Sequence, residues 1–185
     1  MYRATWDNIN RHILVVWQSM GVLFAALAAA FLSGKSFLAP DIASTIVVLS
    51  AGWSLAHAID AKGWYNRNLH IIANIEREFL FARDAETIHP FFASGTRRSA
   101  MIEHLRIQFA LAGAVGSLAL GEHFYSRALP TLDRTAPVDP LRTLPYAAAL
   151  LVVVGLWRLN RGVDTQHREF TNRAPGKARV ERLRE

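Results

Sequence analysis

Four long runs of apolar residues alternate along the chain with segments rich in charged residues. The runs cover Ile13–Gly34, Ile42–Ile59, Leu105–Gly121 and Thr143–Trp157. A hydrocarbon core about 30 Å thick requires roughly 20 residues of α-helix. The first run has that length and carries no charge, and the second run nearly does. The pattern predicts an all-α protein with four transmembrane helices.

The third and fourth runs are shorter than the first two. Arg106 and Arg158 lie where these runs meet charged segments, and their long side chains can extend a span by reaching into the headgroup region. An alternative interpretation has only two spans, with the other two runs forming buried helices of a soluble portion.

Basic residues fall on alternate sides of the four predicted spans, and this asymmetry predicts the orientation. All but four of the 21 Lys and Arg residues lie in the N-terminal arm, in the segment between spans two and three, or in the tail. The exceptions are Lys35, Arg127, Arg134 and Arg142. Because basic segments remain in the cytoplasm, both termini and the central segment are expected there.

Composition limits the chemistry that the chain can perform. The net charge of +6 follows from the predicted topology and from attraction to anionic lipid headgroups, so lipids are the expected partners and nucleic acid is not. There is no cysteine, which excludes disulfides, thiol nucleophiles and cysteine-based metal sites. The first run is longer than the apolar core of a secretory signal, and we interpret it as an uncleaved anchor.

The chain divides into five regions on this basis. Residues 1–12 form an interfacial amphipathic arm, and residues 13–59 hold the first two spans. Residues 60–104 form a cytoplasmic helical hairpin that extends spans two and three. Residues 105–157 hold the last two spans, with an irregular, solvated external loop at 122–142. Residues 158–185 form a basic tail, which is predicted to be a frayed helix followed by disorder.

The segment after Asp60 contains no proline before Glu86, so span two is expected to continue as a helix past the membrane. Apolar residues recur there three and four positions apart, which indicates an amphipathic helix. The chain then turns near His89–Gly95 and returns into span three. This helix is the predicted contact between copies, and the candidate residues are Trp64, Tyr65, Arg67, Asn68, Leu69, Ile72, Asn74, Ile75, Glu76 and Phe79. Packing within its own hairpin is the alternative.

Span three carries small residues at four-residue intervals, Gly113, Ser117 and Gly121. Small residues at this spacing allow helix backbones to approach closely in lipid. They predict either a contact between copies or packing against another helix of the same chain.

Ionisable residues near the ends of the spans are the candidates for chemistry. His57 and Asp60 lie one helical turn apart and could relay protons or gate ions, or they simply mark where span two leaves the membrane. The adjacent couples Glu103/His104 and Glu122/His123 point in directions about 100° apart on a helix, so no metal site is expected from either.

An arginine followed six positions later by a histidine is the pattern of some metal-independent ribonucleases. Arg98 and His104 would be the pair in the cytoplasmic hairpin, although the spacing recurs at Arg83/His89 and Arg161/His167. The chain has no glycine-rich phosphate loop, no nucleophile elbow and no helical zinc motif. We therefore expect no enzymatic activity and no cofactor.

The run Trp64–Leu80 (WYNRNLHIIANIEREFL) directly after the second span resembles the RipA-type family of small bacterial inner-membrane proteins. It is also similar to SLATT-type membrane effector modules of bacterial conflict systems. The first resemblance implies a homo-oligomer in the bacterial inner membrane, and the second implies a pore-forming or membrane-perturbing effector. The resulting hypothesis is a non-enzymatic membrane protein that acts as an oligomeric pore, a scaffold or a stress or defence component. The alternatives are a membrane-tethered ribonuclease and a small ion channel or transporter.

Overall fold

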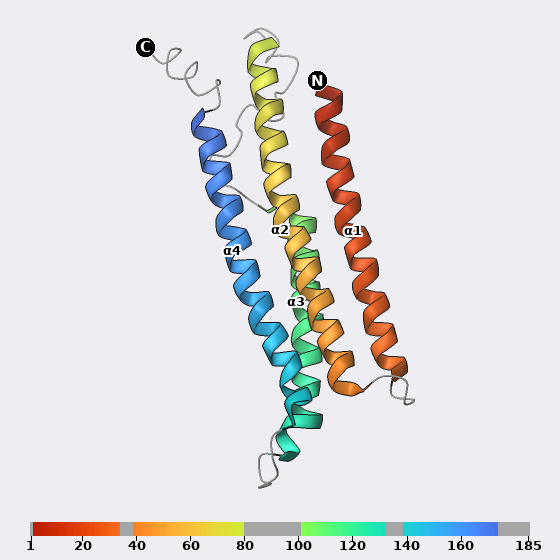
Figure 1. The fold of residues 1–185 in the computed structure, drawn as a ribbon. Coiled ribbons are helices and arrows are strands. Elements are labelled where there is room, and N and C mark those ends of the chain that lie inside the picture. The colour runs from red at the N-terminus through yellow and green to blue at the C-terminus, as the bar shows by residue number, and fades with distance from the viewer. Residues whose placement is uncertain (1, 34–38, 80–100, 132–138, 174–185) are drawn as a thin grey trace.

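The computed structural model is a bundle of long helices (Figure 1). It describes residues 2–33, 39–79, 101–131 and 139–173, and all secondary structure in these ranges is helical. The long helices are α1 (Tyr2–Ser33), α2 (Pro40–Phe79), α3 (Glu103–His123) and α4 (Leu144–Arg173). Three short helical segments lie between α3 and α4, namely η2 (Phe124–Ala128), η3 (Leu129–Thr131) and η4 (Pro140–Thr143). The predicted all-α class is confirmed.

Three of the four helices are long and apolar enough to cross a membrane. The qualifying stretches are Arg3–Ala29, Pro40–Glu76 and Pro140–Arg173. Helix α3 does not qualify, because Arg106 and Gln108 interrupt the apolar residues of its first turns. Three of the predicted spans are therefore confirmed by length and composition, and the fourth span stays a prediction.

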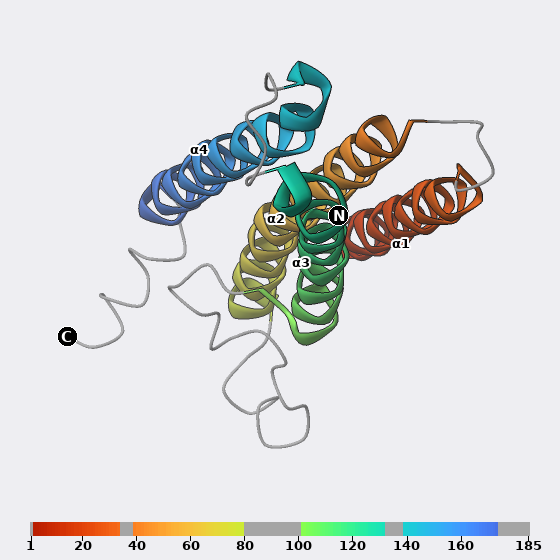
Figure 2. The ribbon, with the colours of Figure 1, turned by 90° about the horizontal axis from the view of Figure 1, so that it is seen from below.

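Helix α2 lies at the centre of the fold, and each of the other long helices packs along it (Figures 1 and 2). Contacts between α1 and α3 are few by comparison, and the extensive contacts of α4 are with α2. Helices α1 and α3 run antiparallel to α2, whereas α4 runs parallel to it (Figure 1). This arrangement matches a chain that passes back and forth four times.

Two glycines of α2 set its distance from α4. A Cβ atom at Gly52 would lie 2.5 Å from Cγ2 of Val152, and one at Gly63 would lie 2.9 Å from Cγ1 of Val163. The two contacts lie eleven residues apart on each helix, which is close to three full turns. The missing side chains let the two parallel helices approach along one line of contact.

Helices α1, α2 and α3 share an apolar core. Its buried members are Met20, Leu23, Val47, Ala51, Ala112 and Val115. A hydrogen bond also joins α1 to α2: the Ser54 hydroxyl donates to the Ser19 carbonyl oxygen over 3.1 Å. Burial of apolar side chains together with one interhelical hydrogen bond fixes the position of α1.

Several predicted boundaries are confirmed, and others are corrected. Pro40 begins α2, and α2 continues beyond Asp60 as expected, to Phe79. The N-terminal arm is not a separate element, because α1 runs without a break from Tyr2 to Ser33. The basic tail begins as regular helix, since α4 extends to Arg173. The predicted turn of the cytoplasmic hairpin lies outside the described residues.

Candidate functional site

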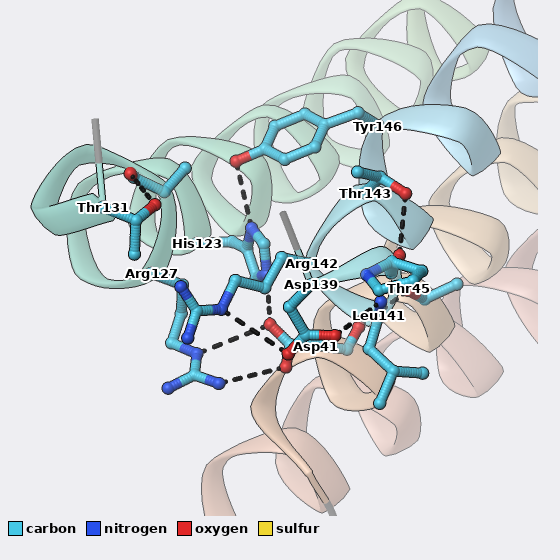
Figure 3. A network of polar contacts seen from close by, with 12 residues as sticks. Asp41, Thr45, His123, Arg127, Thr131, Asp139, Leu141, Arg142, Thr143 and Tyr146 are labelled. Carbon is cyan, nitrogen blue, oxygen red and sulfur yellow. Dashed lines mark hydrogen bonds and ion pairs between the residues drawn. The ribbon is translucent and has the colours of Figure 1, made fainter. Parts of the chain in front are cut away.

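A buried carboxylate at one end of the bundle is the centre of a polar network (Figure 3). Asp41 lies in the first turn of α2, directly after Pro40, and is almost completely buried. Backbone N–H groups at a helix N-terminus are unpaired and favour a negative charge nearby. The local sequence therefore places an ionised group where α2 itself helps to stabilise it.

His123, the last residue of α3, links this carboxylate to α4. Its Nε2 lies 2.9 Å from Oδ1 of Asp41, and its Nδ1 lies 3.0 Å from the hydroxyl oxygen of Tyr146. An ionised carboxylate only accepts hydrogen bonds, so Nε2 carries the proton that it donates to Asp41. In the neutral imidazole, Nδ1 then accepts the Tyr146 hydroxyl proton. Every polar atom of this completely buried ring is satisfied in this way.

Arg127 supplies the positive charge of the network. Its Nη2 donates to Oδ2 of Asp41 over 3.1 Å, and its Nε lies 3.4 Å from Oδ1. The hydrogen bond to Asp41 raises the pKa of the Arg127 guanidinium above its usual value, so this partner stays charged. Arg127 lies on η2, a π-helical turn that continues α3 four residues beyond His123. The predicted irregular loop is thus helical where it begins.

A partly buried ion pair also joins α2 to α4, farther along both helices. Nζ of Lys62 lies 2.8 Å from Oδ1 of Asp164, and it also donates to Oδ1 of Asn160 over 3.1 Å. Lys62 is buried, and both acceptors come from one face of α4. Polar groups therefore link α2 to α4 at two levels, through His123 near the start of both helices and through Lys62 near the middle of α2.

The predicted contact residues of α2 fall into three groups. Trp64, Arg67 and Phe79 are exposed, and Asn68, Ile72 and Glu76 are buried inside the chain; Tyr65, Leu69, Asn74 and Ile75 are half-buried. Ile72 has no exposed surface at all. The expectation that it forms a contact between copies is therefore corrected, because an apolar residue of an amphipathic helix is first buried by its own chain.

The small residues of α3 face away from the other described helices. A Cβ atom at Gly113 or at Gly121 would meet nothing within 4 Å, and Ser117 is exposed. The glycine of α3 that packs closely within the chain is Gly116, whose Cβ would lie 3.1 Å from that of Ala51. Among the described residues, no other helix packs against Gly113 or Gly121, so the structure does not support the alternative that these residues pack within the chain.

The predicted His57/Asp60 pair has two different environments. The His57 ring packs edge-on against Trp53, with a centroid distance of 4.6 Å. Asp60 is exposed and lines a cavity between α2 and α4. The arrangement gives no specific support to a proton relay between them.

The Glu103/His104 and Glu122/His123 couples form no site among the described residues, and the Arg98/His104 pair stays a prediction. Glu103 pairs with Arg106 at 3.5 Å, and Glu122 is exposed whereas its neighbour His123 is buried. Arg98, the proposed partner of His104, lies outside the described residues, as do Arg83 and His89. Among the described histidines and carboxylates, no group of three could hold a metal ion.

Sequence reasoning missed the Asp41 network because its members come from three separate helices. The only local signal was the four-residue interval between His123 and Arg127, which places both on one face of a helix. No protein-family model, no curated protein and no solved structure matches the chain. The structure by itself defines the class: an all-helical protein with three helices able to cross a membrane, in which α2 is tied to α4 by the hydrogen-bonded series Asp41–His123–Tyr146 and by the Lys62–Asp164 ion pair.

Proposed function

We propose that the protein is a non-enzymatic, four-span protein of the bacterial inner membrane that self-associates as a scaffold or a pore. Helix α3 is the fourth span in this proposal. It runs along the same length of α2 that is able to cross the membrane, since Gly116 lies beside Ala51 and His123 bonds to Asp41. A helix packed beside that stretch of α2 enters the same layer of lipid.

The charge distribution supports an orientation with both termini in the cytoplasm. The α1 N-terminus and the α2 and α4 C-termini share one end of the bundle, and the N-terminus of α3 points toward the same end from about the middle of α2 (Figure 1). Most of the Lys and Arg residues belong to sequence segments that adjoin these helix termini along the chain. At the other end the described basic residues are only Arg127 and Arg142, and each is paired with a carboxylate, Asp41 and Asp139 respectively.

The exposed small-residue face of α3 carries the proposal of self-association. Gly113, Ser117 and Gly121 lie on one face of α3, and a Cβ atom added at either glycine would meet no other part of the described chain within 4 Å. In lipid, helices associate mainly by close packing and by interhelical hydrogen bonds, and both are favoured by small residues and by serine. A second copy of α3 meets both requirements. This contact replaces the buried residues of α2 as the main interface.

Native mass measurement and crosslinking in detergent and in nanodiscs test the proposal. We expect wild-type protein to form an oligomer, and Gly113→Leu and Gly121→Leu to shift it toward the monomer by separating the backbones. Gly155→Leu is the matched control, because Gly155 on α4 also has nothing within 4 Å. A strictly monomeric wild-type protein, or an equal effect of all three substitutions, would contradict self-association through α3.

Ion flux into liposomes separates the two forms of the proposal. A pore gives a flux that falls in the Gly113→Leu and Gly121→Leu variants together with the oligomer. A scaffold gives no flux above that of empty liposomes while the oligomer persists.

A further inference from the structure

A cavity of about 260 Å³ lies between the parallel helices α2 and α4, beside the Gly63–Val163 contact. Each helix lines it with one face, at positions i, i+3, i+4 and i+7. The lining residues are Asp60, Gly63, Trp64 and Arg67 from α2, and Val163, Gln166, His167 and Phe170 from α4. All of them belong to one copy of the chain, so the cavity exists independently of the proposed self-association.

His167 is the residue that points to a ligand. Its side chain is buried, yet neither ring nitrogen has a hydrogen-bond partner among the described residues. Buried polar atoms without a partner are rare and costly, and they mark places where a water, an ion or a ligand completes the bonding. His167 lines the cavity, so its imidazole is the side chain that can turn a ring nitrogen toward a group bound there.

Arg67 provides the positive charge on the other wall. Its guanidinium carbon lies 5.5 Å from the ring centroid of Trp64 and 5.2 Å from that of Phe170, so it lies between α2 and α4. The Trp64 ring is itself stacked on His12, with a centroid distance of 5.0 Å. Contacts with ring faces hold the guanidinium in place and leave its N–H groups to donate.

The remaining charges define the sign of the group that fits. Asp164 is paired with Lys62, so its charge is compensated. Asp60 is the one carboxylate that lines the cavity, and it is exposed to solvent. Arginine, imidazole and the Gln166 amide together offer several donors, which is the set that binds phosphate oxygens.

We propose that this cavity binds a phosphate group between Arg67 and His167, supplied by a lipid headgroup or by a soluble phosphate. Basic pockets between transmembrane helices at the cytoplasmic surface bind lipid headgroups, and Trp64 is of the residue type enriched at that level. The two sources share their chemistry and differ in the acyl chains.

Native mass spectrometry of the delipidated protein in detergent tests the proposal with three probes. These are dioctanoyl phosphatidic acid, inorganic phosphate, and dioctanoylglycerol, which has the same acyl chains without phosphate. Adducts of both phosphate compounds indicate a general phosphate site, and an adduct of phosphatidic acid alone indicates a headgroup site. Binding of phosphatidic acid no stronger than that of dioctanoylglycerol, with no phosphate adduct, overturns the proposal.

Substitutions of the cavity residues on α2 and α4 provide a second test of the proposal. Arg67→Gln and His167→Phe should each weaken phosphatidic acid binding about tenfold, because each removes a donor to an anion. Asp60→Asn should strengthen it several-fold by removing the one repelling carboxylate. Arg173→Gln, on the exposed last turn of α4, is the control and should change nothing.

Two results in this test overturn the proposal. One is weaker binding in Asp60→Asn, which would show that this carboxylate supports the bound lipid and does not repel an anionic group. The other is unchanged binding in Arg67→Gln. Because Asp60 and Arg67 are exposed, these two variants remain informative even if His167→Phe perturbs folding.

Discussion

Asp41 and His123, 82 residues apart in the sequence, are joined by a 2.9 Å hydrogen bond between Oδ1 and Nε2 at one end of the bundle. Arg127 binds the same carboxylate, and Tyr146 is held through the imidazole. One carboxylate on α2 therefore fixes the end of α3 and the start of α4 together. Its burial makes the arrangement sensitive to the loss of any partner.

Replacing Asp41 with alanine should lower the stability of the folded protein by about 3 kcal/mol, because it leaves a buried imidazole and a guanidinium without their acceptor. Thermal unfolding in detergent, followed by circular dichroism, measures the change. Glu103→Ala is the control. The Glu103–Arg106 pair is largely exposed and should contribute less than about 1 kcal/mol. Equal effects of the two substitutions would show that the Asp41 network does not stabilise the fold.

Replacing Gly52 with alanine should destabilise the α2–α4 contact by about 1–3 kcal/mol, because the new methyl group overlaps Val152. The second substitution Val152→Ala removes the overlapping atoms and should restore most of the lost stability. Gly155→Ala adds the same methyl group where nothing lies within 4 Å and should not destabilise the protein. The same unfolding measurement applies. A double variant no more stable than Gly52→Ala would contradict the packing.

Single cysteines can map the proposed topology, since the chain has none of its own. Glu103→Cys and Tyr125→Cys place a thiol at exposed positions at the two ends of α3. If α3 spans the membrane, a membrane-impermeant maleimide should label Tyr125→Cys in intact cells and Glu103→Cys only after permeabilisation. Labelling of both positions under the same condition would show that α3 does not cross.

The sequence predicts the helices well and the polar sites poorly, for one physical reason. The lengths of the apolar runs and their periodicity are local signals, and they give the approximate positions of α1, α2 and α4. Asp41 is not among the residues that the sequence singles out, because its partners come from α3, η2 and α4. Contacts between distant residues leave no spacing that a single sequence reveals.

The burial of Ile72 shows a related limit. Its place in an amphipathic stripe predicts that it is covered by something, and it is fully covered within the chain. Periodicity indicates which face of a helix avoids water, but not whether its partner is another helix of the same chain, another copy or lipid. Lys62 is a similar case. Its positive charge contributes to the predicted orientation in the membrane, but it does not reveal the ion pair with Asp164.

The central place of α2 also imposes an order on biosynthesis. Translation delivers α1 and α2 before α3 and α4, and the contact between the first two is the most extensive among the described helices. A hairpin anchored in the bilayer is thus complete while the ribosome is still adding the second half. The later helices then dock on opposite flanks of an existing surface. A substitution that disrupts α3 or α4 leaves the α1–α2 hairpin in place, whereas one that disrupts α2 removes the helix on which the other three pack.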